Sequence, residues 1–178
     1  MKNISYFYFC KELNQKIKDN ILKLKNISII FYDSNPHINQ ESLKIILIFC
    51  KLHKIPLYIY NNYSLAIKIK AHGIFLDSSN NNLCHLFFSK KLKFIGVAHC
   101  HLDYFNKLKQ RCNPVFLSPI FFNKKYSPYK IKSLIKFNLQ TNYWKVDKAL
   151  LGGITKKRIK LLNSLNGLRF GGISYFEE

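Results

Sequence analysis

Residues 57–80 read LYIYNNYSLAIKIKAHGIFLDSSN, and this stretch decides the fold. Pro56 leads into Leu57–Tyr60, a short apolar run of β-forming residues. Ser64–Lys70 has helical spacing, and Gly73–Leu76 is a second apolar run. Two short buried strands separated by one helix predict a parallel pair with a helical crossover, which is the repeating unit of α/β proteins.

The same alternation extends in both directions along the chain. Eight apolar runs are predicted strands: Ser5–Phe9, Ser28–Tyr32, Leu57–Tyr60, Gly73–Leu76, Phe94–Val97, Val115–Leu117, Lys148–Leu151 and Leu168–Gly172. Seven helical or polar segments separate them: Lys11–Lys25, Gln40–Lys54, Ser64–Lys70, Asn82–Ser89, Leu102–Gln110, Tyr129–Asn138 and Lys156–Leu165. Eight such repeats predict a compact (β/α)8 TIM barrel. Because only Ser174–Glu178 follow the eighth strand, we expect the last helix to be missing or reduced.

An open, doubly wound sheet is the alternative architecture. It would usually carry a glycine-rich phosphate turn after the first strand. Cys10-Lys11-Glu12 follows that strand instead, and the first glycine of the chain is Gly73. The barrel is therefore favoured. No linker or low-complexity stretch divides the sequence, so we expect one domain over residues 1–178.

The composition is strongly basic, with a formal net charge of +20 from 29 Lys and Arg against 9 Asp and Glu. The lysines are spread along the chain, and the tightest pairs are 90–91, 124–125 and 156–157. A dispersed positive field favours phosphorylated small molecules as ligands. A basic protein associated with nucleic acid is the more distant alternative.

The cysteines and the apolar runs indicate the compartment. Five cysteines at positions 10, 50, 84, 100 and 112 show no CxxC spacing, which is typical of reduced thiols in a cytoplasmic protein. No run approaches the ~18 apolar residues that a membrane helix needs. We expect a cytoplasmic protein without a membrane partner, and the sequence leaves its oligomeric state open.

Polar and glycine residues follow several predicted strands at their carboxyl ends, where barrel enzymes build their sites. Gly152-Gly153 follows the seventh strand, and Gly172-Ile173-Ser174 ends the eighth. Glycine lets backbone N–H groups approach an anion closely, so these five residues form a predicted phosphate site, with a tight turn as the alternative.

His99-Cys100-His101 follows the fifth strand. His99 is a candidate for proton transfer or substrate contact. Alternate residues of an extended segment point the same way, so the two histidines could also share a transition metal. A purely structural role is the third possibility.

Four stretches in the same order resemble the thiamine-phosphate synthase and thiazole tautomerase superfamily. In the first, the matching residues are Ile59, Leu65, Ala66, Ala71, Gly73 and Leu76. The others are FIGV at 94–97, FLSPIF at 116–121 and LLGGIT at 150–155. The resemblance covers roughly the whole chain. It implies a TIM barrel, a cytoplasmic transferase of thiamine biosynthesis and phosphorylated heterocycles as ligands.

The implied reaction joins an aminopyrimidine diphosphate to a thiazole phosphate and releases pyrophosphate. The family's Mg²⁺ carboxylates fall on Asn61 and Asn80, and Asp77 is the nearby carboxylate. Amide oxygens can coordinate Mg²⁺ but add no charge, so the resemblance implies a weakened metal site. A homologue that binds a thiazole phosphate without this chemistry is the alternative function.

The remaining positions carried over from the family concern the substrate. Its pyrophosphate-binding side chains after the second and third strands fall on Tyr32, Ser34 and Asn62. Ser118 and Asn123 are the substrate positions in the loop after the sixth strand. Lys124 and Lys125 in that loop, together with His99, are the candidate catalytic residues, with a solvated basic loop as the alternative for the two lysines.

Overall fold

A computed structural model describes residues 4–33, 39–83, 92–121, 134–164 and 169–177. Eight parallel strands close into a barrel in chain order, with β1 hydrogen-bonded to both β2 and β8. The strands are β1 Ser5–Cys10, β2 Ile27–Phe31, β3 Leu57–Tyr60, β4 Gly73–Leu76, β5 Lys93–Ala98, β6 Val115–Leu117, β7 Lys148–Leu151 and β8 Arg169–Gly172. The predicted (β/α)8 barrel is confirmed.

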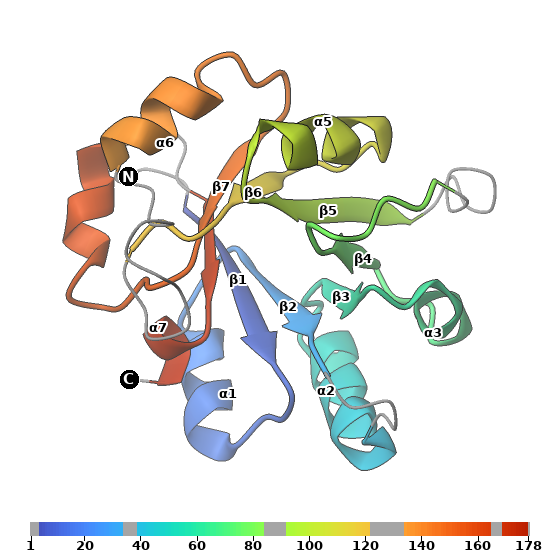
Figure 1. Cartoon of the computed structure of the whole chain (residues 1–178). Coiled ribbons are helices and arrows are strands. Elements are labelled where there is room, and N and C mark those ends of the chain that lie inside the picture. The colour runs from blue at the N-terminus through green and yellow to red at the C-terminus, as the bar shows by residue number, and fades with distance from the viewer. Residues whose placement is uncertain (1–3, 34–38, 84–91, 122–133, 165–168, 178) are drawn as a thin grey trace.

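Helices surround this central barrel (Figure 1). They are α1 Gln15–Leu22, α2 Gln40–Leu52, α3 Tyr63–Lys68, α5 His101–Lys109, α6 Leu134–Thr141 and α7 Ser174–Glu177, with a 3₁₀ helix at Ile159–Ser164. Helix α7, the expected reduced last helix, packs beside α1 (Figure 1). Among the described helices, none is both long and apolar enough to cross a bilayer.

Side-chain caps decide where the first two helices begin. The first helix begins at Gln15 rather than Lys11, because the side chain of Asn14 accepts a hydrogen bond from the Ile17 N–H and caps it. The second begins at Gln40 as predicted, since Asn39 caps it in the same way. The predicted helix over 156–165 is only a 3₁₀ helix. Most of the predicted segment 82–89 lies outside the described residues.

Phenylalanine rings fill the barrel lumen. Phe7 and Phe9 of β1 point inward, whereas Tyr8 between them packs outside the barrel, as the two-residue period of a strand requires. The Phe9 ring lies 5.0 Å from that of Phe75, centroid to centroid, and the Phe7 ring lies 5.1 Å from that of Phe116. The lumen is therefore a packed core.

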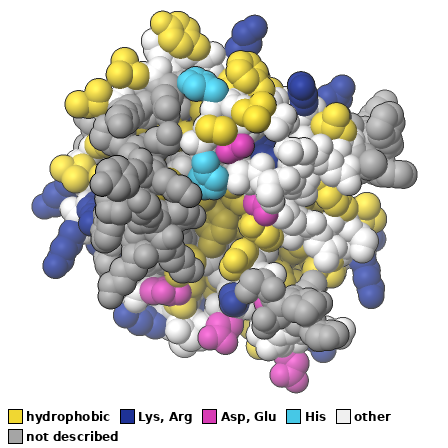
Figure 2. Space-filling model, viewed as in Figure 1, with side chains coloured by type: hydrophobic (Ala, Val, Ile, Leu, Met, Phe, Trp, Pro, Cys, Tyr) yellow, Lys and Arg dark blue, Asp and Glu magenta, His cyan; other side chains and the backbone are white. Residues whose placement is uncertain are grey.

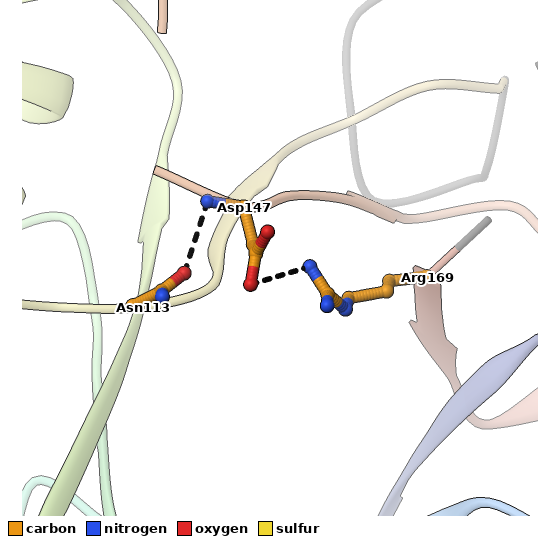
Figure 3. A network of polar contacts seen from close by, with 3 residues as sticks. All are labelled: Asn113, Asp147 and Arg169. Atoms are coloured by element: carbon orange, nitrogen blue, oxygen red, sulfur yellow. Dashed lines mark hydrogen bonds and ion pairs between the residues drawn. The ribbon is translucent and has the colours of Figure 1, made fainter. Parts of the chain in front are cut away.

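A polar cluster ties three strands together at their amino ends (Figure 3). The Asp147 N–H donates to Asn113 Oδ1 at 3.0 Å, and Asp147 Oδ2 pairs with the Arg169 guanidinium at 2.7 Å. Asn113 precedes β6, Asp147 precedes β7 and Arg169 begins β8. This end of the barrel is held by polar contacts that lie opposite the predicted site.

Candidate functional site

The carboxyl ends of β3 and β4 carry a compact polar network around Asp77. The carboxylate accepts hydrogen bonds from Tyr60 Oη at 3.0 Å and Ser79 Oγ at 2.9 Å. It also accepts one from the Asn80 N–H at 2.8 Å. Asn61 joins the two strand ends, because its Oδ1 accepts from the Asp77 N–H at 3.1 Å and from Asn80 Nδ2 at 3.2 Å. The sequence therefore correctly placed Asn61, Asp77 and Asn80 together.

The backbone at Asn61 explains why this residue can join the two strands. Its φ is +48°, in the left-handed region that asparagine tolerates better than most residues. Its backbone N–H donates to the Phe75 carbonyl of β4 at 2.9 Å. The strand end and the side chain are thus both held against β4.

The hydrogen bonds to Asp77 govern its ionisation. Burial alone would raise the pKa of this carboxyl group. The bonds from Ser79, Tyr60, Asn80 and Asn61 outweigh burial and hold the pKa below its usual range. Asp77 is therefore a carboxylate across the neutral range.

The residues carried over as Mg²⁺ ligands do not fit the ion. In proteins Mg²⁺ is held in near-ideal octahedral geometry by one or two carboxylates, with waters and substrate phosphates as the other ligands. Here both oxygens of Asp77 and the Oδ1 of Asn61 already accept protein hydrogen bonds. The Asn80 Oδ1 accepts from Asn82 N–H at 3.1 Å and from Gln110 at 3.3 Å. Within the described ranges, no three His, Cys, Asp or Glu side chains converge as metal ligands would.

His99 lies at the carboxyl end of β5 with a fixed ring. Its Nδ1 is 2.7 Å from the carbonyl oxygen of Ser118, so Nδ1 carries the proton and a neutral ring bears its lone pair on Nε2. Asp103 accepts from the His99 N–H at 2.7 Å and holds the turn into α5. His101 is instead the first residue of α5, so the two histidines do not share an extended segment. The expectation that they point the same way on one strand was wrong.

The glycine pairs at the ends of β7 and β8 differ in their surroundings. Gly152 and Gly153 have φ of +95° and +70°, and a Cβ on Gly153 would lie 2.7 Å from the Phe121 carbonyl oxygen. These glycines therefore let the turn pack against the loop after β6. A Cβ on Gly172 would have Ile154 O as its nearest neighbour, 4.0 Å away, and Ile173 and Ser174 beyond it are exposed. The β8 end is the open one.

A pocket of about 590 Å³ adjoins this open end. It is lined by Tyr8, Phe9, Cys10, Lys11, Glu12, Asn14, Lys16, Ile17, Tyr32, Ile173 and Glu177. Tyr32 and Ile173 were predicted site residues, whereas Lys11 and Lys16 were missed. The Lys11 ammonium lies 5.9 Å from the centre of the Tyr32 ring, and that ring meets Tyr60 edge to face at 4.7 Å. The position of Lys11 directly after the first strand was the signal that could have found it.

Other predicted residues are engaged or lie outside the description. The Asn62 side chain caps α3 by accepting from the Leu65 N–H at 2.9 Å. Ser118 is buried at the end of β6, and its carbonyl holds His99. Ser34, Asn123, Lys124 and Lys125 lie outside the described residues. On the face shown in Figure 2, acidic side chains and a histidine border a central hollow with a hydrophobic floor.

Solved structures share this architecture, although no protein-family model and no curated protein sequence matches the chain. A thiamine phosphate pyrophosphorylase from Pyrococcus furiosus aligns with a TM-score of 0.73 and 10% identity, covering 98% of this chain and 90% of that one. The enzyme of the same name from Bacteroides thetaiotaomicron aligns with a TM-score of 0.58 and 14% identity, covering 96% and 82%. This chain therefore has the fold of the thiamine phosphate pyrophosphorylases.

Proposed function

We propose that this protein binds a phosphorylated aromatic heterocycle at the carboxyl end of its barrel and acts as a thiamine-phosphate-synthase-like protein of thiamine biosynthesis. The observation that carries the proposal is the pocket beside β1, β2 and β8, which combines two lysines with the ring of Tyr32. A flat ring and an anion are complementary to these groups. The likeness to thiamine phosphate pyrophosphorylases supports the same ligand class.

In this proposal several pocket residues have a defined role. Tyr32 stacks on the heterocycle, and Lys11 and Lys16 pair with its phosphate. Ile173 forms the wall beside β8, and the open backbone at the neighbouring Gly172 leaves room for a phosphate oxygen. Glu12 and Glu177 also line the pocket and disfavour ligands with a higher negative charge at that side.

The synthase reaction is the first candidate activity for this site. A C–N bond would form between the aminopyrimidine methylene carbon and the thiazole nitrogen, while the C–O bond to pyrophosphate breaks. The departing pyrophosphate keeps the electron pair of that bond. In this protein lysine ammonium groups would neutralise its charge, since the Asp77 network does not fit Mg²⁺. His99 stays the candidate for contact with the reacting ring.

Binding without catalysis is the second candidate, and the closed Asp77 network favours it. The carboxylate and both amide oxygens are committed to internal hydrogen bonds, so they are ordered for structure rather than for a metal-bound leaving group. In either case the proposal places the protein in the cytoplasm, and the described cysteines are free thiols.

The test combines calorimetry with a product assay. Thiazole phosphate and aminopyrimidine diphosphate are titrated separately, and thiamine phosphate formation is then followed with Mg²⁺ and with a chelator. We expect thiazole phosphate to bind and Lys16→Met to weaken it at least about tenfold. Lys23→Met is the matched control, because this exposed lysine follows α1 and does not line the pocket. No binding of either ligand would overturn the proposal, and product formation would select the synthase.

A further inference from the structure

Lys107 is a fully buried lysine on α5 that no sequence motif pointed to. Its ammonium donates to the Asn80 carbonyl oxygen at 2.6 Å and to Gln110 Oε1 at 2.8 Å. Gln110, which is also fully buried, donates to the same carbonyl at 2.9 Å and to the Asn82 carbonyl at 2.9 Å. Two buried side chains of one helix segment therefore grip the turn that follows β4.

Gly96 of β5 makes room for this lysine. A Cβ on Gly96 would lie 2.7 Å from Cδ of Lys107 and 3.1 Å from Sγ of Cys112. A contact of 2.7 Å between these carbon atoms does not occur, so any larger residue at 96 would displace the lysine stem. The absence of a side chain on the strand lets the stem cross β5 and reach the β4 turn.

Burying an ammonium group costs free energy unless hydrogen bonds or opposite charges compensate for the lost water. A fully buried lysine without such partners would be less favourable than an apolar residue at the same position. Burial lowers the pKa of Lys107, and the negative charges of Asp77 and Asp103 oppose that change. The short hydrogen bonds to carbonyl and amide oxygens stabilise the charged form further. Lys107 is thus a buried, hydrogen-bonded cation on the far side of the turn that carries Asp77.

Hydrogen bonds and a ring contact connect this cation to the pocket lined by Tyr32. Lys107 holds Asn80, the Asn80 N–H binds Asp77 Oδ1, and Asp77 Oδ2 accepts from Tyr60 Oη. The Tyr60 ring stacks on Phe75 at 5.7 Å and meets the Tyr32 ring edge to face at 4.7 Å. Three hydrogen bonds and one ring contact therefore connect Lys107 to Tyr32, which lines the pocket.

We propose that Lys107 is a positioning residue of the barrel mouth, which fixes the Asp77–Asn80 turn and through it orients the Tyr60–Tyr32 aromatic pair against a bound ring. The part that concerns a ligand rests on the proposed function. The part that concerns the turn and the tyrosines does not, and it is measurable without any ligand.

The experiment compares the full-length protein with Lys107→Met, which keeps the stem and removes the charge. The readouts are backbone amide hydrogen exchange at Asp77 and Asn80 and the NMR signals of the Tyr60 and Tyr32 rings. We expect exchange at both amides to accelerate by more than about tenfold and both ring signals to shift. Tyr104→Phe is the control on the same buried face of α5, since it removes only the hydrogen bond to the Lys145 N–H. It should lower stability without these local changes.

Binding of thiazole phosphate supplies an independent arm. If the wild type binds it, Lys107→Met should raise the dissociation constant while Tyr104→Phe leaves it unchanged. If the wild type does not bind it, the proposed function fails but the NMR result still decides the role of Lys107. Should Lys107→Met not fold, the wild-type Lys107 ammonium must show slow proton exchange and coupling across its hydrogen bond to the Asn80 carbonyl. A folded variant with unchanged turn and ring signals, or a wild-type ammonium that exchanges freely, overturns the proposal.

Discussion

At the scale of single residues, Gly153 and Gly172 should differ in how much stability an added side chain costs. Gly153→Ala should cost about 1–3 kcal/mol of unfolding free energy, because its φ of +70° is unfavourable for alanine and the new Cβ would meet the Phe121 carbonyl. Gly172→Ala should leave stability nearly unchanged, since its surroundings are open. Urea unfolding of both variants checks this. Equal losses in the two would contradict the assigned geometry.

The Asp77 carboxylate gives a second residue-scale prediction, for pH. Its folded pKa lies below the ordinary 3.8, so its contribution to stability is present above that value and is lost as pH falls through the folded pKa. Asp77→Asn should cost about 1 kcal/mol at neutral pH, a modest figure because the group is partly exposed.

The measurement for Asp77 is urea unfolding over a series of pH values. The stability difference between wild type and Asp77→Asn should shrink as the pH drops below 3.8. A difference that persists unchanged through the acid range would mean that the charged form is not what the network stabilises.

Among the elements, the short helix α7 closes the barrel where an eighth full helix would normally lie. Phe176 is buried, and its ring lies 4.9 Å from that of Tyr8 on β1. Phe176→Ala should therefore cost about 3–4 kcal/mol, as large-to-small changes in a core do. Phe105→Ala is the control, because that ring on α5 is 55% exposed and should cost less than about 1 kcal/mol. Thermal unfolding of the two variants compares them, and similar losses would show that α7 is dispensable.

The link between β7 and β8 should contribute much less. Asp147 and Arg169 have side chains 48% and 33% exposed, so solvent screens their ion pair. Arg169→Gln should cost at most about 1 kcal/mol, and added salt should reduce that cost. Lys23→Gln is the control, because it removes an exposed positive charge that lies outside the link between β7 and β8. A large, salt-insensitive loss at Arg169 would contradict a screened surface pair.

The strands were predictable from sequence because each is a short apolar run bounded by turn-forming residues. Leu57–Tyr60, Gly73–Leu76 and Lys148–Leu151 were found with their observed bounds. Helix limits were harder, because a side-chain cap rather than periodicity decides the start, as at Asn14. The apolar period alone cannot show that the segment after Lys156 folds as a 3₁₀ helix.

For the molecule as a whole, the net charge of +20 implies self-repulsion in the folded state. Added salt should therefore raise the unfolding midpoint by screening. Because the Asp77 network does not fit Mg²⁺, MgCl₂ should raise the midpoint no more than KCl of equal ionic strength. Differential scanning calorimetry at matched ionic strengths checks this. Extra, saturable stabilisation by Mg²⁺ would show that a metal site forms after all.

The location of the candidate site was predictable at this scale, but the hydrogen bonds between its residues were not. Parallel topology brings every carboxyl end to one face, which is why Asn61 and Asp77 could be placed together from sequence. Which oxygens remain available depends on hydrogen bonds between distant segments. Lys107 is an example: in the sequence it is one of many lysines, although its spacing of three from the buried Tyr104 assigns it to the inward face of α5.

The two ends of the barrel differ in what their side chains do. The ring cluster packs the barrel interior, and the Asn113–Asp147–Arg169 cluster joins three strands at their amino ends, opposite the candidate site. Changes to side chains at the other rim should therefore alter what the barrel can bind while the packed interior keeps its shape.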